Sequence, residues 1–316
     1  MTAPDPGPRA ESEMTDGFEQ QTTRTALLQA TSKLRIAGVP DADHTANLLL
    51  RHSLDRDAHW IAAHAGEPLT EPQAKCLFEL VERRASGEPT AYVVRQHVFM
   101  ELPFEVTSDV FIPRPATEVV VQIAIERFNA AFSDSTSGRP ANAAVADVGT
   151  GCGCIAVVLA RRLPDATVYA TDVSVAALQV ARRNAARHQV ESRCRFVQCS
   201  LLSGVVPDSM LPRPGFDLIV SNPPYLGRKA AHNLSREVRD HEPAVALYGG
   251  EQGYELYAAL IEEAAAHLRP GGILVLELGH NSLPGIRSLT HDARWKGAAV
   301  TLDRSGFPRV VAVQRA

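Results

Sequence analysis

The chain has 316 residues, of which 45% are hydrophobic and 22% are charged, and its formal net charge is -4. This length is about twice that of a typical domain of roughly 150 residues, so we expect two domains. The ordinary composition excludes collagen-like, coiled-coil and fully disordered chains. The mild negative charge gives no support to a protein that is held on nucleic acid through phosphate contacts.

The sequence shows neither a secretory signal nor a membrane-spanning segment. No run of about 18 or more uncharged apolar residues occurs, and the N-terminus lacks the basic and apolar regions of a signal peptide. We therefore expect a soluble, cytoplasmic protein. The 5 cysteines show no spacing typical of a disulfide framework or a zinc site, so we predict neither disulfides nor a bound metal.

The first part of the chain is predicted to hold a tail and a helical domain. Residues 1–22 are rich in Pro, Gly, Ser, Thr and acidic side chains, so we expect a disordered tail. From residue 23 to 90 apolar residues recur at helical spacing, which indicates a small bundle of about four helices. Thr70, followed by Glu71-Pro72, has the pattern of a helix start.

A change of period follows the helical region. Residues 91–115 contain two short β-rich runs, at 93–99 and 104–111, and are predicted to form a β linker or hairpin. Residues 116–316 then alternate β-rich runs with helical stretches, as in a parallel sheet with helices on both faces. The predicted strands lie at 143–148, 167–171, 195–199, 216–221 and 272–278, with a terminal hairpin at 298–302 and 309–313.

A glycine-rich turn follows the first of these strands. Its residues are Gly149, Thr150, Gly151, Cys152 and Gly153. Glycine lets the backbone turn tightly and approach a ligand without an obstructing Cβ. The spacing differs from the G-x-G-x-x-G pattern of dinucleotide sites, so S-adenosyl-L-methionine, which has no phosphates, fits better. Its carboxylate and sulfonium end is expected over the turn, with Asp147 nearby.

Asp172 ends the second predicted strand of this region. A carboxylate at this position is suited to accept hydrogen bonds from both ribose hydroxyls of a nucleoside. The alternative is a structural role, in which Asp172 caps the helix that starts near Val175. The two roles are compatible, and the glycine turn favours the nucleoside.

The fourth strand ends in the tetrapeptide Asn222-Pro223-Pro224-Tyr225. The two prolines fix the backbone, so the Asn222 side chain and the Pro223 carbonyl are held stiffly. If each accepts one N–H, they orient a planar NH2 group toward a methyl donor and stabilise the positive charge that develops on its nitrogen. Tyr225 is expected to pack on the planar substrate group. The alternative is a rigid turn without chemistry.

These residues resemble the Asn-Pro-Pro-Tyr class of S-adenosylmethionine-dependent amino-methyltransferases and, within it, the HemK/PrmC family of release factor glutamine N5-methyltransferases. The resemblance covers residues 25–316. Besides the glycine turn and the tetrapeptide, it rests on Gly87-Glu88-Pro89 with Ala91-Tyr92, Ile112-Pro113-Arg114-Pro115 with Thr117-Glu118, the run from Glu237 to Pro243, the run from Gly249 to Gly253, and the run from Leu268 to Gly272.

The resemblance implies an α/β fold, namely a Rossmann-like class I methyltransferase with a seven-stranded sheet in residues 116–316 and a small N-terminal helical domain that recognises the substrate. It also implies the reaction. The methyl group of S-adenosyl-L-methionine goes to the side-chain amide nitrogen, N5, of the glutamine in the Gly-Gly-Gln motif of class I peptide chain release factors. We expect a monomer that binds neither nucleic acid nor a membrane.

The same resemblance assigns residues to the site, without a metal. It implies that the cofactor is bound by Gly149, Thr150, Gly151, Cys152, Gly153, Asp172, Leu201 and Asn222. It also implies that the substrate amide is bound by Asn222, Pro223, Pro224 and Tyr225. Of these, Asn222, Pro223 and Tyr225 are the implied catalytic residues. The segment from Ile112 to Glu118 is implied to line the pocket.

Three alternatives stay open at this point. A nucleic-acid amino-methyltransferase uses a similar tetrapeptide, but the chain shows no dense patch of Lys and Arg that would bind phosphates. A ribosomal-protein glutamine methyltransferase has a similar plan, although Pro115 favours the release-factor branch. A binding protein that has lost its chemistry is suggested only by Ala116 and Ser200, which depart from the family pattern.

Overall fold

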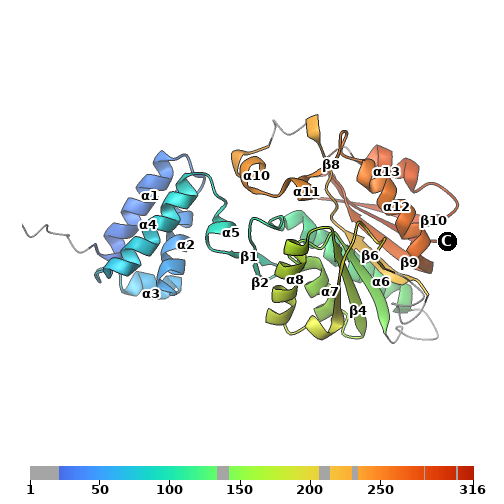
Figure 1. The fold of residues 1–316 in the computed structure, drawn as a ribbon, viewed down its shortest axis with the longest axis horizontal. Helices are drawn as coiled ribbons and strands as arrows, with labels where there is room; N and C mark the ends of the chain where they lie inside the picture. The colour runs from blue at the N-terminus through green and yellow to red at the C-terminus, as the bar shows by residue number, and fades with distance from the viewer. Residues whose placement is uncertain (1–20, 134–141, 206–213, 230–233, 281, 304) are drawn as a thin grey trace, which may run out of the picture. The chain divides into compact units, whose positions relative to one another are not determined.

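The computed structural model describes residues 21–133, 142–205, 214–229, 234–280, 282–303 and 305–316 (Figure 1). Internal contacts divide the chain into two compact units, one up to Gly87 and one from Glu88. The tail predicted for the N-terminus lies outside the described residues, except for Gln21 and Thr22. These two residues belong to the first unit, because the Leu69 N–H donates to the Gln21 carbonyl and Thr22 caps a helix.

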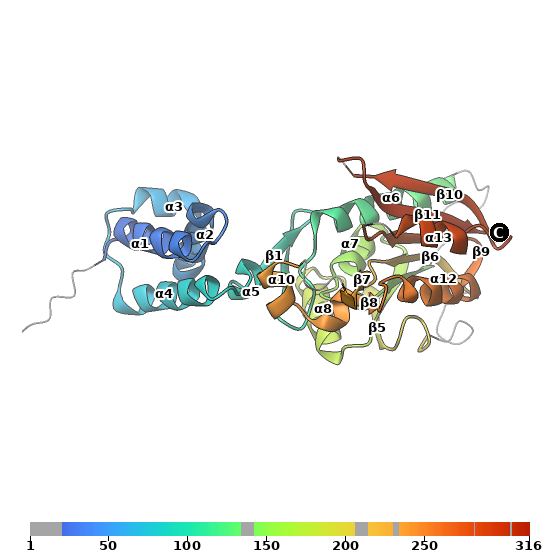
Figure 2. The same cartoon turned by 90° about the horizontal axis from the view of Figure 1, so that it is seen from above.

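The first unit is a bundle of helices (Figure 2). Its core is aliphatic, with Leu34, Leu49 and Leu77 fully buried. The Thr22 and Thr70 side chains cap two of the helices, and Thr70 forms a reciprocal capping box with Gln73. The helix start predicted at Thr70 is confirmed. The helical bundle expected from the sequence is confirmed. Its helices are α1 (Thr23–Ile36), α2 (Ala42–Leu54), α3 (Ala58–Ala63) and α4 (Glu71–Ala85).

A short hairpin opens the second unit and is smaller than predicted. After the helical turn α5 (Thr90–Val93), strands β1 (Gln96–Phe99) and β2 (Leu102–Glu105) pair around Met100 and Glu101, which both have positive φ. The predicted strand at 104–111 is wrong beyond Glu105. The Glu105 N–H donates to Asn184 Oδ1, and the Glu105 carbonyl accepts from Asn184 Nδ2, so a distant helix takes the bonds that a longer strand would need.

A seven-stranded sheet forms the centre of the second unit, in the order β10-β11-β9-β6-β3-β4-β5. Strands β9, β6, β3, β4 and β5 run parallel, whereas β11 is antiparallel to both β9 and β10. The α/β architecture and the terminal hairpin are therefore confirmed. The strands are β3 (Ala143–Val148), β4 (Ala166–Asp172), β5 (Cys194–Gln198), β6 (Phe216–Ser221), β9 (Leu268–Glu277), β10 (Trp295–Leu302) and β11 (Pro308–Arg315).

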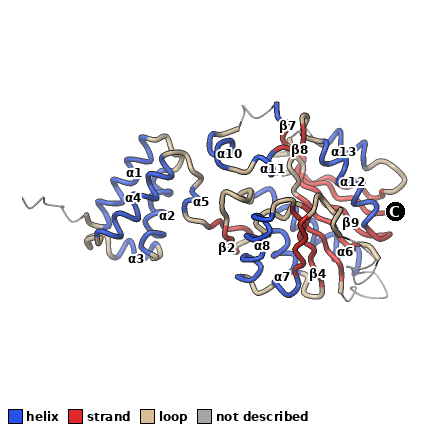
Figure 3. Tube along the Cα trace, viewed as in Figure 1, coloured by secondary structure: helices blue, strands red, loops and turns tan. Residues whose placement is uncertain are grey.

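Helices cover the sheet (Figure 3), and buried apolar side chains form two layers against its faces. Side chains alternate along the strands, so Val145 of β3 joins one layer while Ala144 and Ala146 join the other. The first layer includes α6 (Pro115–Ser133), α7 (Cys154–Arg162) and α8 (Val175–Arg187), and the second includes α12 (Glu255–His267) and α13 (Leu283–Leu289). Burial on both faces explains why β3 and β6 are almost continuously apolar, and why their predicted bounds are correct.

Short elements complete the second unit. Strands β7 and β8 pair in parallel, just after β6 and just before α12. These remaining elements are η1 (Glu191–Arg193), β7 (Leu226–Gly227), α10 (Arg236–His241), α11 (Ala244–Leu247) and β8 (Tyr248–Gly250).

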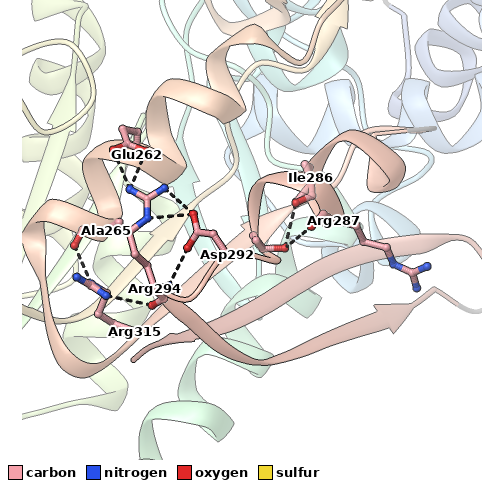
Figure 4. A network of polar contacts seen from close by, with 8 residues as sticks. Glu262, Ala265, Ile286, Arg287, Asp292, Arg294 and Arg315 are labelled. Carbon is pink, nitrogen blue, oxygen red and sulfur yellow. Dashed lines mark hydrogen bonds and ion pairs between the residues drawn. The ribbon is translucent and has the colours of Figure 1, made fainter.

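A polar network fastens the terminal hairpin to α12 (Figure 4). The Arg294 guanidinium bridges Glu262 of α12 and Asp292, with N–O distances between 2.6 and 3.0 Å. Arg315, at the end of β11, donates to the carbonyls of Ala265 and Arg294. Several charged hydrogen bonds thus tie the start of β10 and the end of β11 to α12.

Removing the Thr70 cap should loosen the start of α4. In Thr70→Ala the first turn loses its side-chain acceptor, which costs about 1 kcal/mol. Hydrogen exchange followed by mass spectrometry should accelerate about fivefold in that turn, because local opening becomes easier by this amount. Thr70→Ser retains the hydroxyl and should exchange like the unaltered protein. Equal exchange in Thr70→Ala would contradict the role of the cap.

Candidate active site

A cavity of about 480 Å³ lies at the carboxyl ends of the parallel strands in the second unit. It is lined by residues that follow β3, β4, β5 and β6, which are the ends where ligands bind in open α/β sheets. Nearly all of the residues predicted for the site line this one cavity: Gly149, Thr150, Gly151, Cys152, Asp172, Leu201, Asn222, Pro223, Pro224 and Tyr225.

The glycine turn is tied to the neighbouring strand β4. The N–H groups of Gly149 and Thr150 both donate to the Thr171 carbonyl at 2.9 Å, and the Gly151 N–H donates to Asp172 Oδ2 at 3.0 Å. A Cβ at Gly149 or Gly151 would meet no atom within 4 Å, and both residues have positive φ. The turn therefore presents bare backbone to the cavity, as a ligand that lies against it requires.

Gly153 is buried and does not line the cavity, although the sequence places it with the cofactor contacts. Its φ is +82°, and a Cβ there would lie 2.9 Å from the Ala181 Cβ in α8. Asn184 of the same helix donates to the Cys152 carbonyl at 2.9 Å. Gly153 therefore allows α8 to pack closely beneath the turn.

Asp147 supports the turn from below. One carboxylate oxygen accepts from the Thr150 hydroxyl at 2.6 Å and from the Ala156 N–H at 3.0 Å. The side chain is fully buried, and this burial raises the pKa of Asp147 to about 7. The other oxygen, Oδ1, has no hydrogen-bond partner among the described residues. Asp147 therefore acts on the turn from within the protein and does not line the cavity.

Asp172 lies at the rim of the cavity rather than in the helix cap. Ser174 is the N-cap of α8, because its side chain accepts from the Ala177 N–H. Asp172 accepts instead from the N–H groups of Gly151 and Ser174. The structural alternative considered for Asp172 is therefore wrong in its detail. The half-buried carboxylate joins the glycine turn to the end of β4 and still lines the cavity.

Leu201 forms the neighbouring part of the wall. Its carbonyl accepts from the Thr171 hydroxyl at 2.7 Å, and its φ of +51° turns the chain at this point. Ser200, which departs from the family pattern, is also in the wall and is exposed.

The tetrapeptide forms the opposite part of the wall. Asn222 is half-buried, and its Nδ2 donates to the Thr117 hydroxyl at 3.1 Å. Pro223 is buried, and the preceding Ser221 donates to the Val148 carbonyl at 2.7 Å. This bond turns the Nδ2 end of the amide toward Thr117, so the oxygen Oδ1 points away from Thr117 and can accept from a ligand.

A second glycine-rich run, from Gly249 to Gly253, supports the tetrapeptide from behind. A Cβ on Gly249 would lie 2.2 Å from the Pro224 carbonyl oxygen, and one on Gly253 would lie 2.5 Å from that of Tyr225. The Tyr225 ring packs against Gly279, where a Cβ would approach it to 2.7 Å. Burial raises the pKa of Tyr225 to about 12, so its hydroxyl stays protonated at neutral pH.

An ion pair closes one side of the cavity. Arg114 lines the cavity and binds the buried carboxylate of Glu242, which also accepts from the Ile112 N–H. Burial raises the pKa of Glu242, and the nearby Arg114 opposes this effect. Of the segment from Ile112 to Glu118 implied by the family, Pro113, Arg114 and Thr117 line the cavity.

Two residues of the site lie outside the sequence prediction of catalytic and binding groups. The sequence indicates Thr117 only as part of a family motif, and it gives no motif that contains Glu277, at the end of β9. Both are almost completely buried, at 2% exposure, and they hydrogen-bond to each other at 2.7 Å. A carboxylate at the end of a buried strand is the one sequence signal that could have indicated Glu277.

The cavity can hold two ligand groups side by side. The bare backbone of the glycine turn and the carboxylate of Asp172 line one part of the cavity and suit a nucleoside. The Asn222 side chain and the Pro223 carbonyl offer acceptors to a planar NH2 group. In the part of the chain that the structure describes, no cluster of His, Cys, Asp and Glu could hold a metal ion, and no helix is long and apolar enough to span a membrane.

Comparisons with known proteins agree with this geometry. Residues 25–94 match the PrmC N-terminal domain, and residues 131–240 match the methyltransferase small domain. The release factor glutamine methyltransferase of Bradyrhizobium diazoefficiens is 36% identical over 308 residues, which cover 96% of this chain and 98% of that protein. The chain belongs to the release factor glutamine methyltransferase family. The resemblance seen in the sequence is thereby confirmed.

Other members of the release factor glutamine methyltransferase family show similar identities. The protein of Koribacter versatilis is 36% identical over 92% of this chain and 97% of its own. That of Chlorobaculum tepidum is 40% identical over 78% and 81%. Among solved structures, the ribosomal protein L11 methylase of Lactobacillus delbrueckii subsp. bulgaricus has 23% identity and a TM-score of 0.44, covering 65% of this chain and 81% of its own.

Alanine substitutions at two glycines of the turn should distinguish the cost of a positive φ from the cost of a steric clash with α8. Gly149 and Gly153 both have positive φ, which costs a Cβ-bearing residue about 1–2 kcal/mol. Only Gly153→Ala also places a Cβ against the backbone of α8. Thermal unfolding without ligand should therefore show a clearly lower Tm for Gly153→Ala than for Gly149→Ala. Equal values would contradict the close packing of α8 described above.

Proposed function

We propose that this chain transfers the methyl group of S-adenosyl-L-methionine to the N5 amide nitrogen of the glutamine in the Gly-Gly-Gln motif of class I release factors. The observation that carries the proposal is the tetrapeptide at the cavity. The Asn222 amide has its N–H side engaged by Thr117 and its oxygen left for a ligand. Membership of the family, over nearly the whole chain, supports the same reaction.

The glycine turn and its surroundings fit the proposed cofactor. The cavity volume of about 480 Å³ lies within the usual range for sites of small ligands, roughly 300–1,000 Å³. Asp172 would accept from the ribose hydroxyls, and Leu201 would pack on the adenine. Asp147, fully buried and outside the cavity lining, would hold the turn beneath the cofactor through Thr150 and Ala156. When bound, the cofactor supplies a methyl group on a positively charged sulfur.

The tetrapeptide supplies acceptors for the substrate amide. An amide nitrogen is a poor nucleophile, because its lone pair is delocalised into the carbonyl. Asn222 Oδ1 and the Pro223 carbonyl would each accept one N–H, which orients the nitrogen and stabilises positive charge that develops on it. Tyr225, held against Gly279, would limit the planar group to one orientation.

We further propose a division of labour within the chain. Residues 23–90 would recognise the release factor, residues 91–115 would connect, and residues 116–316 would carry out methyl transfer. Release factors act on the ribosome, so the reaction is expected in the cytoplasm. The protein partner also suits the mildly negative charge of the chain, since no phosphate backbone has to be bound.

Replacing Asn222 should abolish most turnover. In Asn222→Ala the substrate amide loses one positioning acceptor, so kcat should fall by roughly 10²-fold or more, while cofactor binding changes less. The measurement is the intact mass of a class I release factor after incubation with enzyme and cofactor, with the methylated residue located by peptide sequencing. Full activity of Asn222→Ala would contradict the mechanism. A release factor that stays unmethylated with the unaltered enzyme would contradict the proposed function. So would transfer of a labelled methyl group from the cofactor to rRNA instead of the factor.

Replacing Asp172 should affect the cofactor instead. Asp172→Asn keeps the size of the side chain but removes its charge, so the Kd for S-adenosyl-L-methionine should rise by about tenfold or more, as for loss of a charged hydrogen bond. Isothermal titration calorimetry measures this value directly. Gln198→Glu, outside the cavity lining near the end of β5, controls for changes in local charge. Unchanged affinity in Asp172→Asn would contradict the ribose assignment.

A further inference from the structure

A chain of hydrogen bonds runs from the tetrapeptide into the core. Asn222 Nδ2 donates to the Thr117 hydroxyl at 3.1 Å, and this hydroxyl donates to Glu277 Oε2 at 2.7 Å. Asn222 directly follows β6, Thr117 lies in α6 and Glu277 ends β9, so the three residues are far apart in the sequence. Thr117 and Glu277 are each only 2% exposed, so bulk water does not replace these bonds.

The buried carboxylate of Glu277 decides which group donates and which accepts in this series of hydrogen bonds. An ionised carboxylate accepts hydrogen bonds and donates none, so Glu277 requires the Thr117 proton. Once that proton points to Glu277, the Thr117 oxygen offers only lone pairs to Asn222. The N–H side of the Asn222 amide must then face Thr117. A flipped amide would place two oxygen acceptors against each other or leave the buried carboxylate without its donor, and both arrangements are costly.

We propose that Thr117 and Glu277 are positioning residues that fix the orientation of the Asn222 side-chain amide, so that its oxygen faces the substrate. The inference rests on the proposed function, because it concerns the acceptor that holds the glutamine N–H. Neither residue touches the reacting atoms in this arrangement. Their effect is to keep one of two nearly isosteric rotamers, only one of which presents an acceptor to the cavity.

The surroundings of Glu277 make this device sensitive to pH. Burial raises the pKa of Glu277 to about 7, while the Thr117 hydroxyl, Arg309 and Arg114 oppose the shift. Tyr225 and Tyr257 also face this region, but burial keeps the pKa of both hydroxyls above the neutral range. Tyr257 donates to the backbone carbonyl of Glu277, so its bond does not depend on the carboxyl charge.

Protonation of Glu277 should therefore free the Asn222 side-chain amide to adopt either orientation. Above pH about 7 the carboxylate is ionised and the Asn222 orientation is fixed. As the pH falls through this value, the carboxyl group gains a proton that it can donate to Thr117, and both amide orientations become possible. We expect kcat to fall on the acid side of pH 7 while the Kd for the cofactor stays nearly constant.

The kinetic test compares isosteric variants in the release-factor assay. Thr117→Val removes the hydroxyl and should lower kcat about tenfold, the scale of one lost hydrogen bond, with little change in KM. Thr117→Ser should recover most of the loss. The amide in Glu277→Gln can both donate and accept, so it no longer fixes which way the Thr117 hydroxyl donates. We expect kcat to drop several-fold and to lose its dependence on pH near 7. Thr290→Val, which removes a buried hydroxyl just after α13, is the matched control.

A second measurement is independent of methyl transfer. The side-chain amide signals of Asn222, identified by their absence in Asn222→Asp, should shift with an apparent pKa near 7 in the NMR spectrum of the unaltered protein. They should not shift in Glu277→Gln. Folded Thr117→Val and Glu277→Gln proteins with unaltered kcat and pH profile would overturn the inference, as would Asn222 signals that are insensitive to pH.

The two measurements also separate this inference from the proposed function. If the unaltered enzyme methylates the release factor and the variants match it, only the positioning role fails. If the unaltered enzyme leaves the factor unmethylated, the proposed function fails, and the NMR titration still decides whether Glu277 sets the orientation of Asn222.

Discussion

The site depends on hydrogen bonds that join the ends of adjacent strands. Ser221 at the end of β6 donates to the Val148 carbonyl of β3, and the Thr171 carbonyl of β4 accepts from the glycine turn that follows β3. The Thr171 hydroxyl continues the row to Leu201, beyond β5. Four strand ends therefore form one stiff edge. A ligand that lies along this edge meets groups whose positions do not have to be established when it binds.

Two buried acids lie beneath the two halves of this edge. Asp147 is under the glycine turn and Glu277 is near the tetrapeptide, and burial raises the pKa of each to about 7. Each charged form is disfavoured by burial, so each acid lowers the stability of the folded chain at neutral pH and above. Both carboxylates accept a threonine hydroxyl, from Thr150 and from Thr117. The fold thus retains two costly groups at the places where the orientation of polar atoms matters most.

Sequence reasoning succeeded where local pattern and burial coincide. The strands β3 and β6 are buried on both faces, so their apolar runs mark their bounds, and the glycine turn and tetrapeptide follow them directly. It failed where distant residues decide. The strand expected after Glu105 is prevented by Asn184, and the pairing of Thr117 with Glu277 spans most of the second unit. Neither contact leaves a periodic or spacing signal in the residues around it.

The glycine run behind the tetrapeptide has a consequence for how such a sequence can diverge. At Gly249 any side chain would begin where the Pro224 carbonyl oxygen lies, and Gly253 is similarly confined by Tyr225. Mutational drift at these two positions is therefore limited as severely as at residues that meet the reactants, although neither glycine has to touch them. The evolutionary constraint on this enzyme extends to a layer of backbone behind the chemistry, where the absence of side chains lets two segments pack closely.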